Sequence, residues 1–277
     1  MGQKKKSLVF RIIAHIILLL GSLTMLVPFI WMLSSSFKSL GEVFVFPPTL
    51  FGERLVWENY TEISSRFDYF AYFMNSIKVS AWVVIWQVFT SAMAGYVFAK
   101  LNFRGRDKIF TLYLATMMIP FHVTIITNYL QMSRYGLVNT LWSLMIPASV
   151  SAFGTFLMRQ FFITVPTELI EAAKIDGCNP LMTFIRIAFP MAKSTIATLC
   201  IFCFMNTWND YFTPLIYIND ARKYTLPLGL ASMKGMYSTD WPVLMASSVI
   251  AVLPVLIAFL CAQDAFVKGV MMSGMKD

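Results

Sequence analysis

The sequence predicts an all-α polytopic membrane protein with six transmembrane helices and both termini in the cytoplasm. Three observations carry this prediction. The 277 residues are 58% hydrophobic and only 13% charged, whereas soluble domains carry about 25% charged residues. The apolar residues form continuous runs that are long enough to cross a bilayer as helices. The Lys and Arg residues between these runs are distributed unequally on the two sides.

A membrane-spanning helix needs about 20 mainly apolar residues at a rise of 1.5 Å per residue. Six segments meet this requirement: Ile12–Phe37, Val79–Ala99, Ile109–Ser133, Tyr135–Met158, Ser194–Ile218 and Trp241–Gln263. The runs lack the two-residue alternation of barrel strands, which favours helices. The first run follows Lys4–Lys6 as a signal peptide would, but it is too long for a signal sequence and is expected to remain as a span.

The distribution of basic residues predicts the orientation. One side holds Lys4, Lys5, Lys6, Arg11, Lys100, Arg104, Arg106, Lys108, Arg159, Lys174, Arg186, Lys193, Lys268 and Lys276. The other side holds Lys38, Arg54, Arg66, Arg134, Arg222, Lys223 and Lys234, with Lys78 ambiguous. The side richer in Lys and Arg is normally cytoplasmic. The formal net charge of +8 is therefore interpreted as membrane topology, and no nucleic-acid partner is expected.

The loops divide the chain into three parts. Residues 1–70 comprise a cytoplasmic N-terminal tail, the first span and an outer loop. Residues 71–265 hold the remaining spans, with a cytoplasmic loop at 165–190. Residues 266–277 form a cytoplasmic C-terminal tail. Cys178, Cys200, Cys203 and Cys261 have no further ligands at metal-binding spacing, so neither a metal site nor a disulfide is predicted.

The loop at 165–190 contains signals for two short helices. Thr167 is a candidate N-cap, and Gly177 can adopt the left-handed conformation that ends a helix. Asn179 followed by Pro180 then begins a second helix, as N-cap and first helical residue. Small and acidic residues on this loop are suited to docking another protein. On the residues alone, a docking knob and an ordinary solvated loop remain open as interpretations.

The same loop resembles the EAA loop of binding-protein-dependent ABC importer permeases. The residues that carry the resemblance are Glu171, Ala172, Ala173, Asp176, Gly177, Phe184 and Pro190. Segments Met118–Phe121, Trp208–Asp210, Thr225–Leu230 and Phe266–Gly269 are similar to the sugar-importing, maltose-type branch of that family. The tail after Gly269 departs from the Gly- and Ala-rich ending of these relatives, so its contacts stay open.

The resemblance implies a type I ABC importer transmembrane fold in the cytoplasmic membrane of a bacterium or archaeon. It also implies the partners: a second permease that forms a pseudo-symmetric heterodimer, two cytoplasmic ATPase subunits and an extracytoplasmic solute-binding protein. In that family the EAA loop is the coupling helix that inserts into a cleft of the ATPase. ATP and Mg would be bound by that ATPase, and this chain would hold no cofactor.

Polar residues inside the spans are candidates for the substrate path. Asp210 lies in the fifth predicted span beside Asn206, Trp208 and Asn209, and intramembrane acids are often functional. An interhelical hydrogen-bond network is the structural alternative for Asp210. His122, two residues after Pro120 in the third span, is either a path residue or a histidine satisfied by a neighbouring helix.

The sequence lacks the features that characterise two other classes of membrane protein. A secondary transporter driven by an ion gradient would show paired ionisable residues at the midplane and an inverted repeat, and neither is visible. A membrane enzyme would need a catalytic constellation, and Glu171 and Asp176 have no nucleophile or metal ligands beside them. The sequence contains no phosphate-binding Gly-x-x-x-x-Gly-Lys-Ser/Thr loop, so this chain is not expected to hydrolyse ATP.

Overall fold

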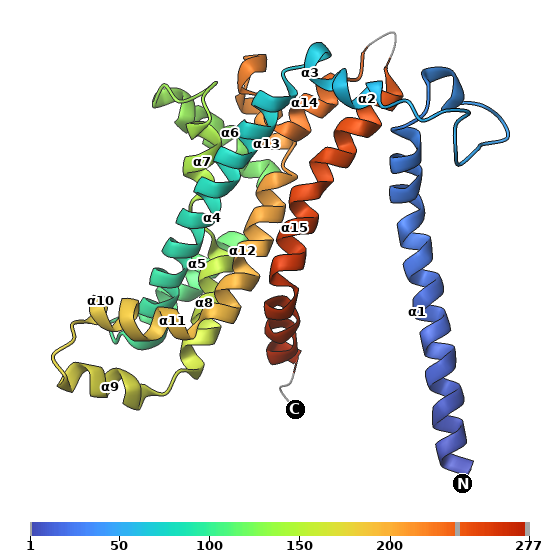
Figure 1. The fold of residues 1–277 in the computed structure, drawn as a ribbon. Coiled ribbons are helices and arrows are strands. Elements are labelled where there is room, and N and C mark those ends of the chain that lie inside the picture. The colour runs from blue at the N-terminus through green and yellow to red at the C-terminus, as the bar shows by residue number, and fades with distance from the viewer. Residues whose placement is uncertain (1, 236–238, 275–277) are drawn as a thin grey trace. The chain divides into compact units, whose positions relative to one another are not determined.

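The computed structural model describes residues 2–235 and 239–274, which contain helices, turns and loops but no β-strand (Figure 1). The side chains of residues 2–9, 66, 262 and 264–274 lie outside the description. The longer helices are α1 (Gly2–Ser35), α4 (Tyr69–Lys100), α5 (Arg106–Ala115), α6 (Phe121–Arg134), α8 (Ala152–Thr164), α9 (Thr167–Ile175), α12 (Lys193–Trp208) and α15 (Trp241–Gly274). Short helices connect them: η1 (Leu40–Glu42), α2 (Glu58–Thr61), α3 (Ile63–Arg66), η2 (Thr116–Met118), α7 (Trp142–Ala148), α10 (Pro180–Thr183), the π-helix η3 (Phe184–Ala188), α11 (Phe189–Met191), α13 (Phe212–Tyr217), η4 (Ala221–Lys223) and α14 (Leu226–Ser232).

Three continuous helices are long and apolar enough to cross a membrane. They cover Phe10–Ser35, Tyr69–Lys100 and Trp241–Cys261, and they correspond to the first, second and sixth predicted spans. The second begins ten residues before the predicted start at Val79, because residues 69–78 are also helical. Apolar side chains along α1 are exposed, including Leu18 at 68% and Met25 at 76%. Such a helix needs lipid or another protein as its surroundings.

The other three predicted spans are not single straight helices. The third is bent by 100° between Arg106–Met118 and Phe121–Arg134, the fourth is divided into α7 and α8, and the fifth into α12 and α13. Two further bends lie at the ends of the 165–190 loop: Trp142–Thr164 with Thr167–Ile175 by 80°, and Pro180–Met191 with Lys193–Trp208 by 81°. Counting each bent pair as one span, up to six helices meet the requirements of length and composition. The 100° bend follows from Pro120, which cannot donate a helical hydrogen bond and stands as the N-cap of α6. By contrast, Pro28, Pro147 and Pro254 lie inside helices.

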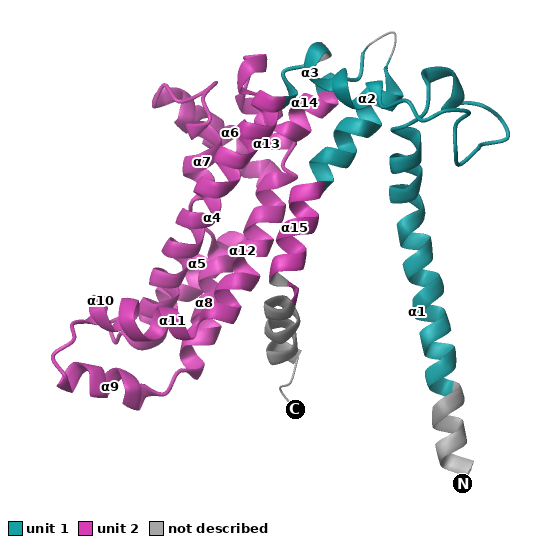
Figure 2. Ribbon diagram, viewed as in Figure 1, with its two compact units in different colours: residues 1–69, 232–252 teal, residues 70–231, 253–277 magenta. Residues whose placement is uncertain are grey.

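The described chain divides into two compact units (Figure 2). Unit 1 contains residues 1–69 and 232–252, and unit 2 contains residues 70–231 and 253–277. In unit 1 the amide of Asn59 donates to the backbone oxygens of Ser36 and Lys38, both at 2.9 Å. Lys38 is 1% exposed and donates to the backbone oxygen of Thr49. These bonds hold the loop after α1 against α2.

Unit 2 contains two groups of buried apolar side chains. One lies between α4, α6, α7, α13 and α14 and includes Val83, Ile125 and Tyr217. The other lies between α4, α8 and the 184–192 segment and includes Met158, Phe162 and Phe184. Helices α4 and α8 approach closely at Gly95, where an added Cβ would lie 2.7 Å from the Met158 Cβ and 2.8 Å from the Arg159 backbone nitrogen. Small residues allow this approach between helices in a membrane.

Candidate functional site

The 165–190 loop forms the helix–turn–helix that its sequence predicts. Helix α9 ends before Gly177, whose φ of +83° lies in the left-handed region that favours glycine. The Asn179 side chain then accepts the backbone N–H of Met182 at 2.7 Å, and Pro180 is the first residue of α10. The prediction for Thr167 was wrong: Pro166 occupies the N-cap, and Thr167 is already helical. Pro166 has a fixed φ that suits a helix entry, so no hydroxyl cap is used.

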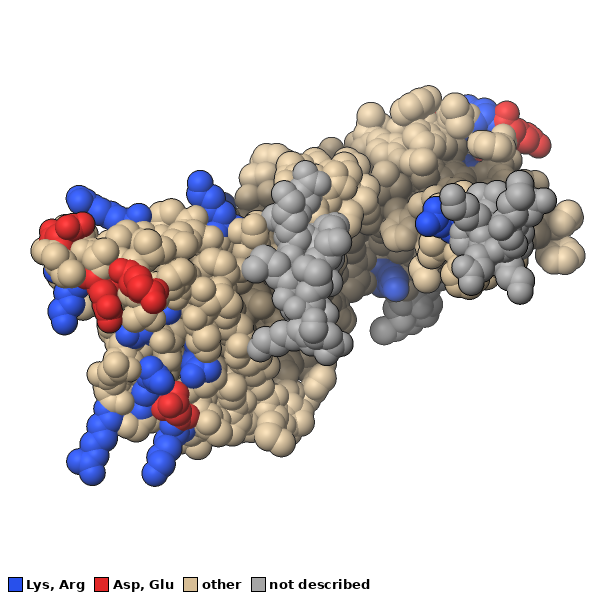
Figure 3. Space-filling view, turned by 90° about the horizontal axis from the view of Figure 1, so that it is seen from below, with Lys and Arg blue, Asp and Glu red and all other residues tan. Residues whose placement is uncertain are grey.

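One face of α9 is solvent-exposed and mixes acidic, small and apolar side chains. Glu171, Ala172 and Asp176 are exposed, and Ile175 is 86% exposed. Nothing lies within 4 Å of a Cβ added at Gly177. The end of the molecule that carries α9 and α10 presents acidic side chains among Lys and Arg (Figure 3). An exposed isoleucine between acids, on a face with free space around it, is suited to contact with another protein.

Other residues of the loop point inward and anchor it to the rest of unit 2. Ala173 and Phe184 are each 3% exposed. The Phe184 ring lies 5.3 Å from the ring of Tyr96 on α4 and 6.3 Å from that of Phe162 on α8. Pro190 is exposed in α11, just before the 81° bend into α12. The loop is therefore packed against α4 and α8 through its second half.

A hydrogen bond fixes the beginning of the loop as well. The Lys100 Nζ atom, at the end of α4, donates to the backbone oxygen of Val165 at 2.5 Å. Val165 itself is 3% exposed. Both ends of the 165–190 loop are thus attached to α4, while α9 extends away between them (Figure 1).

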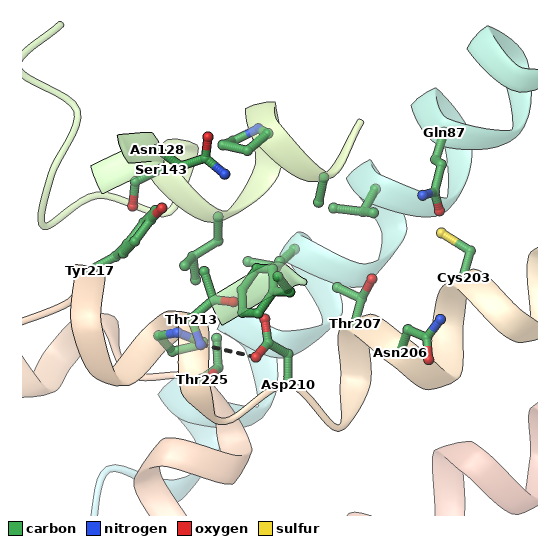
Figure 4. Close-up of a pocket in the computed structure, with 17 residues that line it drawn as sticks. Gln87, Asn128, Ser143, Cys203, Asn206, Thr207, Asp210, Thr213, Tyr217 and Thr225 are labelled. Carbon is green, nitrogen blue, oxygen red and sulfur yellow. Dashed lines mark hydrogen bonds between the residues drawn. The ribbon is translucent and has the colours of Figure 1, made fainter. Parts of the chain in front are cut away.

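A second feature of unit 2 is a partly open cavity of about 330 Å³ (Figure 4). Its polar lining consists of Gln87, Asn128, Ser143, Asn206, Thr207, Asp210, Thr213, Tyr217 and Thr225. Its apolar lining consists of Val79, Val83, Phe121, Leu144, Pro147, Ala148, Cys203 and Pro214. The cavity lies where α6 and α13 begin, so the two helix breaks after Ile119 and Trp208 both open onto it.

Asp210 lies in the second of these breaks. Residues 209–211 separate α12 from α13, so the predicted continuous span from Ser194 to Ile218 is interrupted there. The Asp210 Oδ1 atom accepts the backbone N–H of Thr213, in the first turn of α13, at 3.0 Å (Figure 4). This bond is local. It therefore differs from the interhelical network that was the structural alternative for Asp210.

The structure brings together two of the five candidate path residues. Asn206 and Asp210 line the cavity, whereas Trp208, Asn209 and His122 are not among its lining residues. Trp208 is 2% exposed and stacks on Phe204 at 5.4 Å.

Asn209 donates to the backbone oxygen of Met205 at 2.9 Å, and the ring of His122 lies 5.3 Å from that of Phe212.

Sequence reasoning missed Gln87 and Thr225 as residues of the cavity lining. An amide in the middle of an apolar run was a usable signal for Gln87, and Thr225 begins the Thr225–Leu230 segment that is similar to the sugar-importing branch.

Within the described part of the chain, no group of three or more His, Cys, Asp or Glu residues is placed to hold a metal ion. Asp210 is the one acidic side chain of the cavity lining, and its neighbours there are amides and hydroxyls. These groups form hydrogen bonds with polar, uncharged molecules. The arrangement offers binding groups and no nucleophile–base pair.

Comparison with known proteins decides the family. A family model described as "Binding-protein-dependent transport system inner membrane component" matches residues 87–272. This chain belongs to that family. It is 31% identical over 271 residues to the arabinooligosaccharides transport system permease protein AraQ of Bacillus subtilis, covering 97% of this chain and 96% of that one. It is 32% identical over 260 residues to the lactose transport system permease protein LacG of Rhizobium radiobacter, covering 94% of each.

A solved structure of a bacterial ABC transporter that imports the acidic polysaccharide alginate has the same fold. One of its chains superposes with a TM-score of 0.84 at 23% identity, over 93% of this chain and 96% of that chain. This inner membrane component therefore has the type I ABC importer fold, as the sequence predicts. It is a multi-pass membrane protein and a transport permease by family.

Proposed function

We propose that this chain is one permease subunit of an ATP-driven importer and forms half of the translocation path for a mono- or oligosaccharide. An extracytoplasmic binding protein delivers the sugar, and a second, different permease completes the path as a pseudo-symmetric heterodimer. Two cytoplasmic ATPases bind ATP and Mg, and this chain hydrolyses no ATP itself. The complex lies in the cytoplasmic membrane of a bacterium or archaeon, with six spans and both termini in the cytoplasm.

The observation that carries this proposal is the architecture of the 165–190 loop. It presents Glu171, Ala172 and Asp176 to an outside partner, while Phe184 is buried against Tyr96. A displacement of α9 by a protein bound to its exposed face is transmitted to α4 and α8 through the buried Phe184 ring, because closely packed interiors transmit strain. ATP binding at the ATPases would thereby shift the permease between inward-open and outward-open states.

Two observations support a carbohydrate as cargo. The relatives named above transport arabinooligosaccharides and lactose. In addition, the cavity combines amide and hydroxyl groups with the rings of Phe121 and Tyr217. Sugars offer hydroxyls that pair with such polar groups and apolar ring faces that pack on aromatic rings.

The test is uptake into liposomes that contain the whole complex, comparing the wild type with Gly177→Asp. Asp tolerates the left-handed region better than most residues and there is free space at this position, so the backbone should hold. The added carboxylate would stand on the docking face. We expect the substitution to lower ATP-dependent uptake of labelled arabinotriose or lactose at least tenfold and to weaken co-purification of the ATPase.

Gly136→Asp is the matched control. Gly136 also has a positive φ, of +68°, with nothing within 4 Å of an added Cβ, but it lies in the turn after α6. The complex with Gly136→Asp should therefore take up sugar as the wild type does. Uptake that follows an ion gradient, ignores ATP and is insensitive to Gly177→Asp would contradict the importer and support a secondary transporter.

A further inference from the structure

The cavity of unit 2 contains a buried hydroxyl without a partner. Thr225 is 5% exposed and lines the cavity, and its Oγ1 atom has no hydrogen-bond partner in the described part of the chain. Leaving a buried hydroxyl unpaired is unfavourable, so such groups commonly mark a place where a ligand or water binds. The lining position of Thr225 makes a molecule inside the cavity its available partner.

The local structure explains why this hydroxyl is free. Thr225 directly precedes α14, a position where threonine usually caps the helix with its own side chain. The Ser76 hydroxyl on α4 accepts the backbone N–H of Leu226, the first residue of α14, at 2.7 Å. A threonine cap would accept from the second or third helical residue, but the second is Pro227, which has no N–H, and the Thr225 hydroxyl makes no bond to the third.

Asp210 provides a second hydrogen-bonding group in the lining of the same cavity. Its Oδ1 atom is used by Thr213, while its Oδ2 atom has no hydrogen-bond donor among the described residues. Gln87 from α4, Asn128 from α6 and Asn206 from α12 add amide groups from three different helices (Figure 4). Groups from α4, α6, α12 and the start of α14 thus surround one space.

The charge of the lining restricts what can bind there. The seventeen lining residues include the Asp210 carboxylate but no Lys, Arg or His. A negatively charged solute would meet a carboxylate with no compensating cation, which is unfavourable at low dielectric. A neutral solute with several hydroxyls would satisfy the carboxylate, the Thr225 hydroxyl and the amides together. The volume of about 330 Å³ lies at the lower end of ligand pockets, which suits one or two sugar rings.

We propose that this cavity is a solute subsite within this chain, selective for neutral over acidic sugars, in which Thr225 and Asp210 contact the sugar hydroxyls directly. The inference rests on the proposed function and deepens it. It assigns binding to this permease and not solely to its partner. It also predicts a cargo that differs in charge from alginate, the acidic polysaccharide of the structural relative.

The experiment measures equilibrium binding of labelled arabinobiose to the purified complex, with the binding protein omitted so that only the permeases can hold the sugar. Thr225→Val removes the hydroxyl at nearly constant volume and should weaken binding threefold to tenfold, the value of one uncharged hydrogen bond. Thr225→Ser should keep the wild-type affinity. Thr198→Val is the control: Thr198 is also buried, at 6% exposed, but it lies outside the cavity and its hydroxyl bonds the backbone oxygen of Ser194.

Asp210→Asn tests the charge selectivity. Asparagine can still accept the Thr213 N–H, so this hydrogen bond is kept while the charge is removed. Competition by an alginate disaccharide, relative to neutral arabinobiose, should strengthen at least tenfold in this variant.

Equal affinity of the wild type and Thr225→Val, or an unchanged competition ratio in Asp210→Asn, would overturn the subsite. So would a wild-type complex that imports the sugar with ATP but binds none without the binding protein. A complex that imports no neutral sugar with ATP would instead overturn the proposed function.

Discussion

The ring of Phe184, in the 165–190 loop, lies 5.3 Å from the ring of Tyr96 on α4, with the two planes at 45°. Phe184 also contacts Phe162 and Phe189, at 6.3 and 5.6 Å. Four aromatic rings from α4, α8, η3 and α11 therefore meet at one point. This cluster connects the exposed loop to α4 and α8.

Phe184→Ala should disconnect the loop from α4. Removing a buried phenylalanine costs about 3–5 kcal/mol, and the cavity left behind would let the loop move independently of the helices. We expect ATP-dependent uptake by the complex to fall more than tenfold, while the ATPase is still retained because the docking face of α9 is unchanged. Uptake and co-purification measured side by side check this prediction.

Phe184→Leu preserves most of the buried volume and should keep at least a third of wild-type uptake. Phe103→Ala is the control, because Phe103 is 40% exposed and lies outside this cluster. Loss of uptake in all three variants alike would show that the packing at Phe184 is not specific to coupling.

Gly95→Ala should destabilise the packing of α4 on α8. Its new Cβ would lie 2.7 Å from the Met158 Cβ and 2.8 Å from the Arg159 backbone nitrogen. Backbone atoms cannot rotate away, so the helices must separate, at a cost of about 1–3 kcal/mol. Unfolding in detergent, compared between the wild type and Gly95→Ala, should show this loss of stability. Gly21→Ala in α1, where nothing lies within 4 Å, should change stability little; equal stabilities of the two variants would contradict the close approach.

The sequence was sufficient to predict those parts of the structure that one local signal determines. Long uncharged runs produced α1, α4 and the first part of α15, because helices are the structures that satisfy their own backbone in lipid. Gly177 and the Asn179–Pro180 pair located the turn in the 165–190 loop, because each acts on its own backbone.

The sequence was insufficient to predict which residues meet in the cavity, because they come from segments that are distant in the chain. Asn206 and Trp208 looked equivalent as path residues, yet Trp208 is buried against Phe204 while Asn206 lines the cavity. A helix turns by about 100° per residue, so residues two apart point to different sides. Similarly, Thr225 lines the cavity only because Gln87, Asn128 and Asn206, which are far from it in the sequence, surround the same space. No pattern within either segment contains this information.

Asn139 should stabilise the two loops that it joins. It has a φ of +59°, its Oδ1 atom accepts the backbone N–H groups of Asn219 and Asp220 at 3.0 and 2.9 Å, and its backbone oxygen accepts the Lys223 Nζ at 2.9 Å. Asn139→Ala loses the side-chain acceptor and leaves a residue with a Cβ in the left-handed region, a combined cost of about 2–4 kcal/mol.

Two further variants separate these contributions. Asn139→Gly relieves the backbone strain but still lacks the acceptor, and Asn139→Asp keeps an acceptor. Thermal midpoints should therefore decrease in the order wild type, Asp, Gly, Ala. If Asp were as destabilising as Ala, the two backbone hydrogen bonds would not be what Asn139 contributes.

Glu42 should make the 39–53 loop of unit 1 sensitive to acid. The backbone N–H of Glu53 and the backbone N–H and hydroxyl of Ser39 donate to its carboxylate, each at 2.8 Å. These bonds, with that from Glu53 first, lower the pKa of Glu42 from 4.5 to about 2. Because the folded pKa is depressed, this stabilisation is fully present above about pH 4.5 and is lost as the pH falls through 2.

Hydrogen exchange at the Glu53 amide, compared between the wild type and Glu42→Gln, measures this effect. The neutral amide of Gln accepts more weakly than a carboxylate, so at pH 6 the wild type should protect Glu53 several-fold better. The ratio of the two exchange rates should approach one as the pH falls from 4.5 to 2, because protonated Glu42 resembles Gln. Glu53→Gln keeps its own backbone donor and should follow the wild type throughout. A ratio that stays constant from pH 6 to pH 2 would show that the carboxylate charge of Glu42 does not hold this loop.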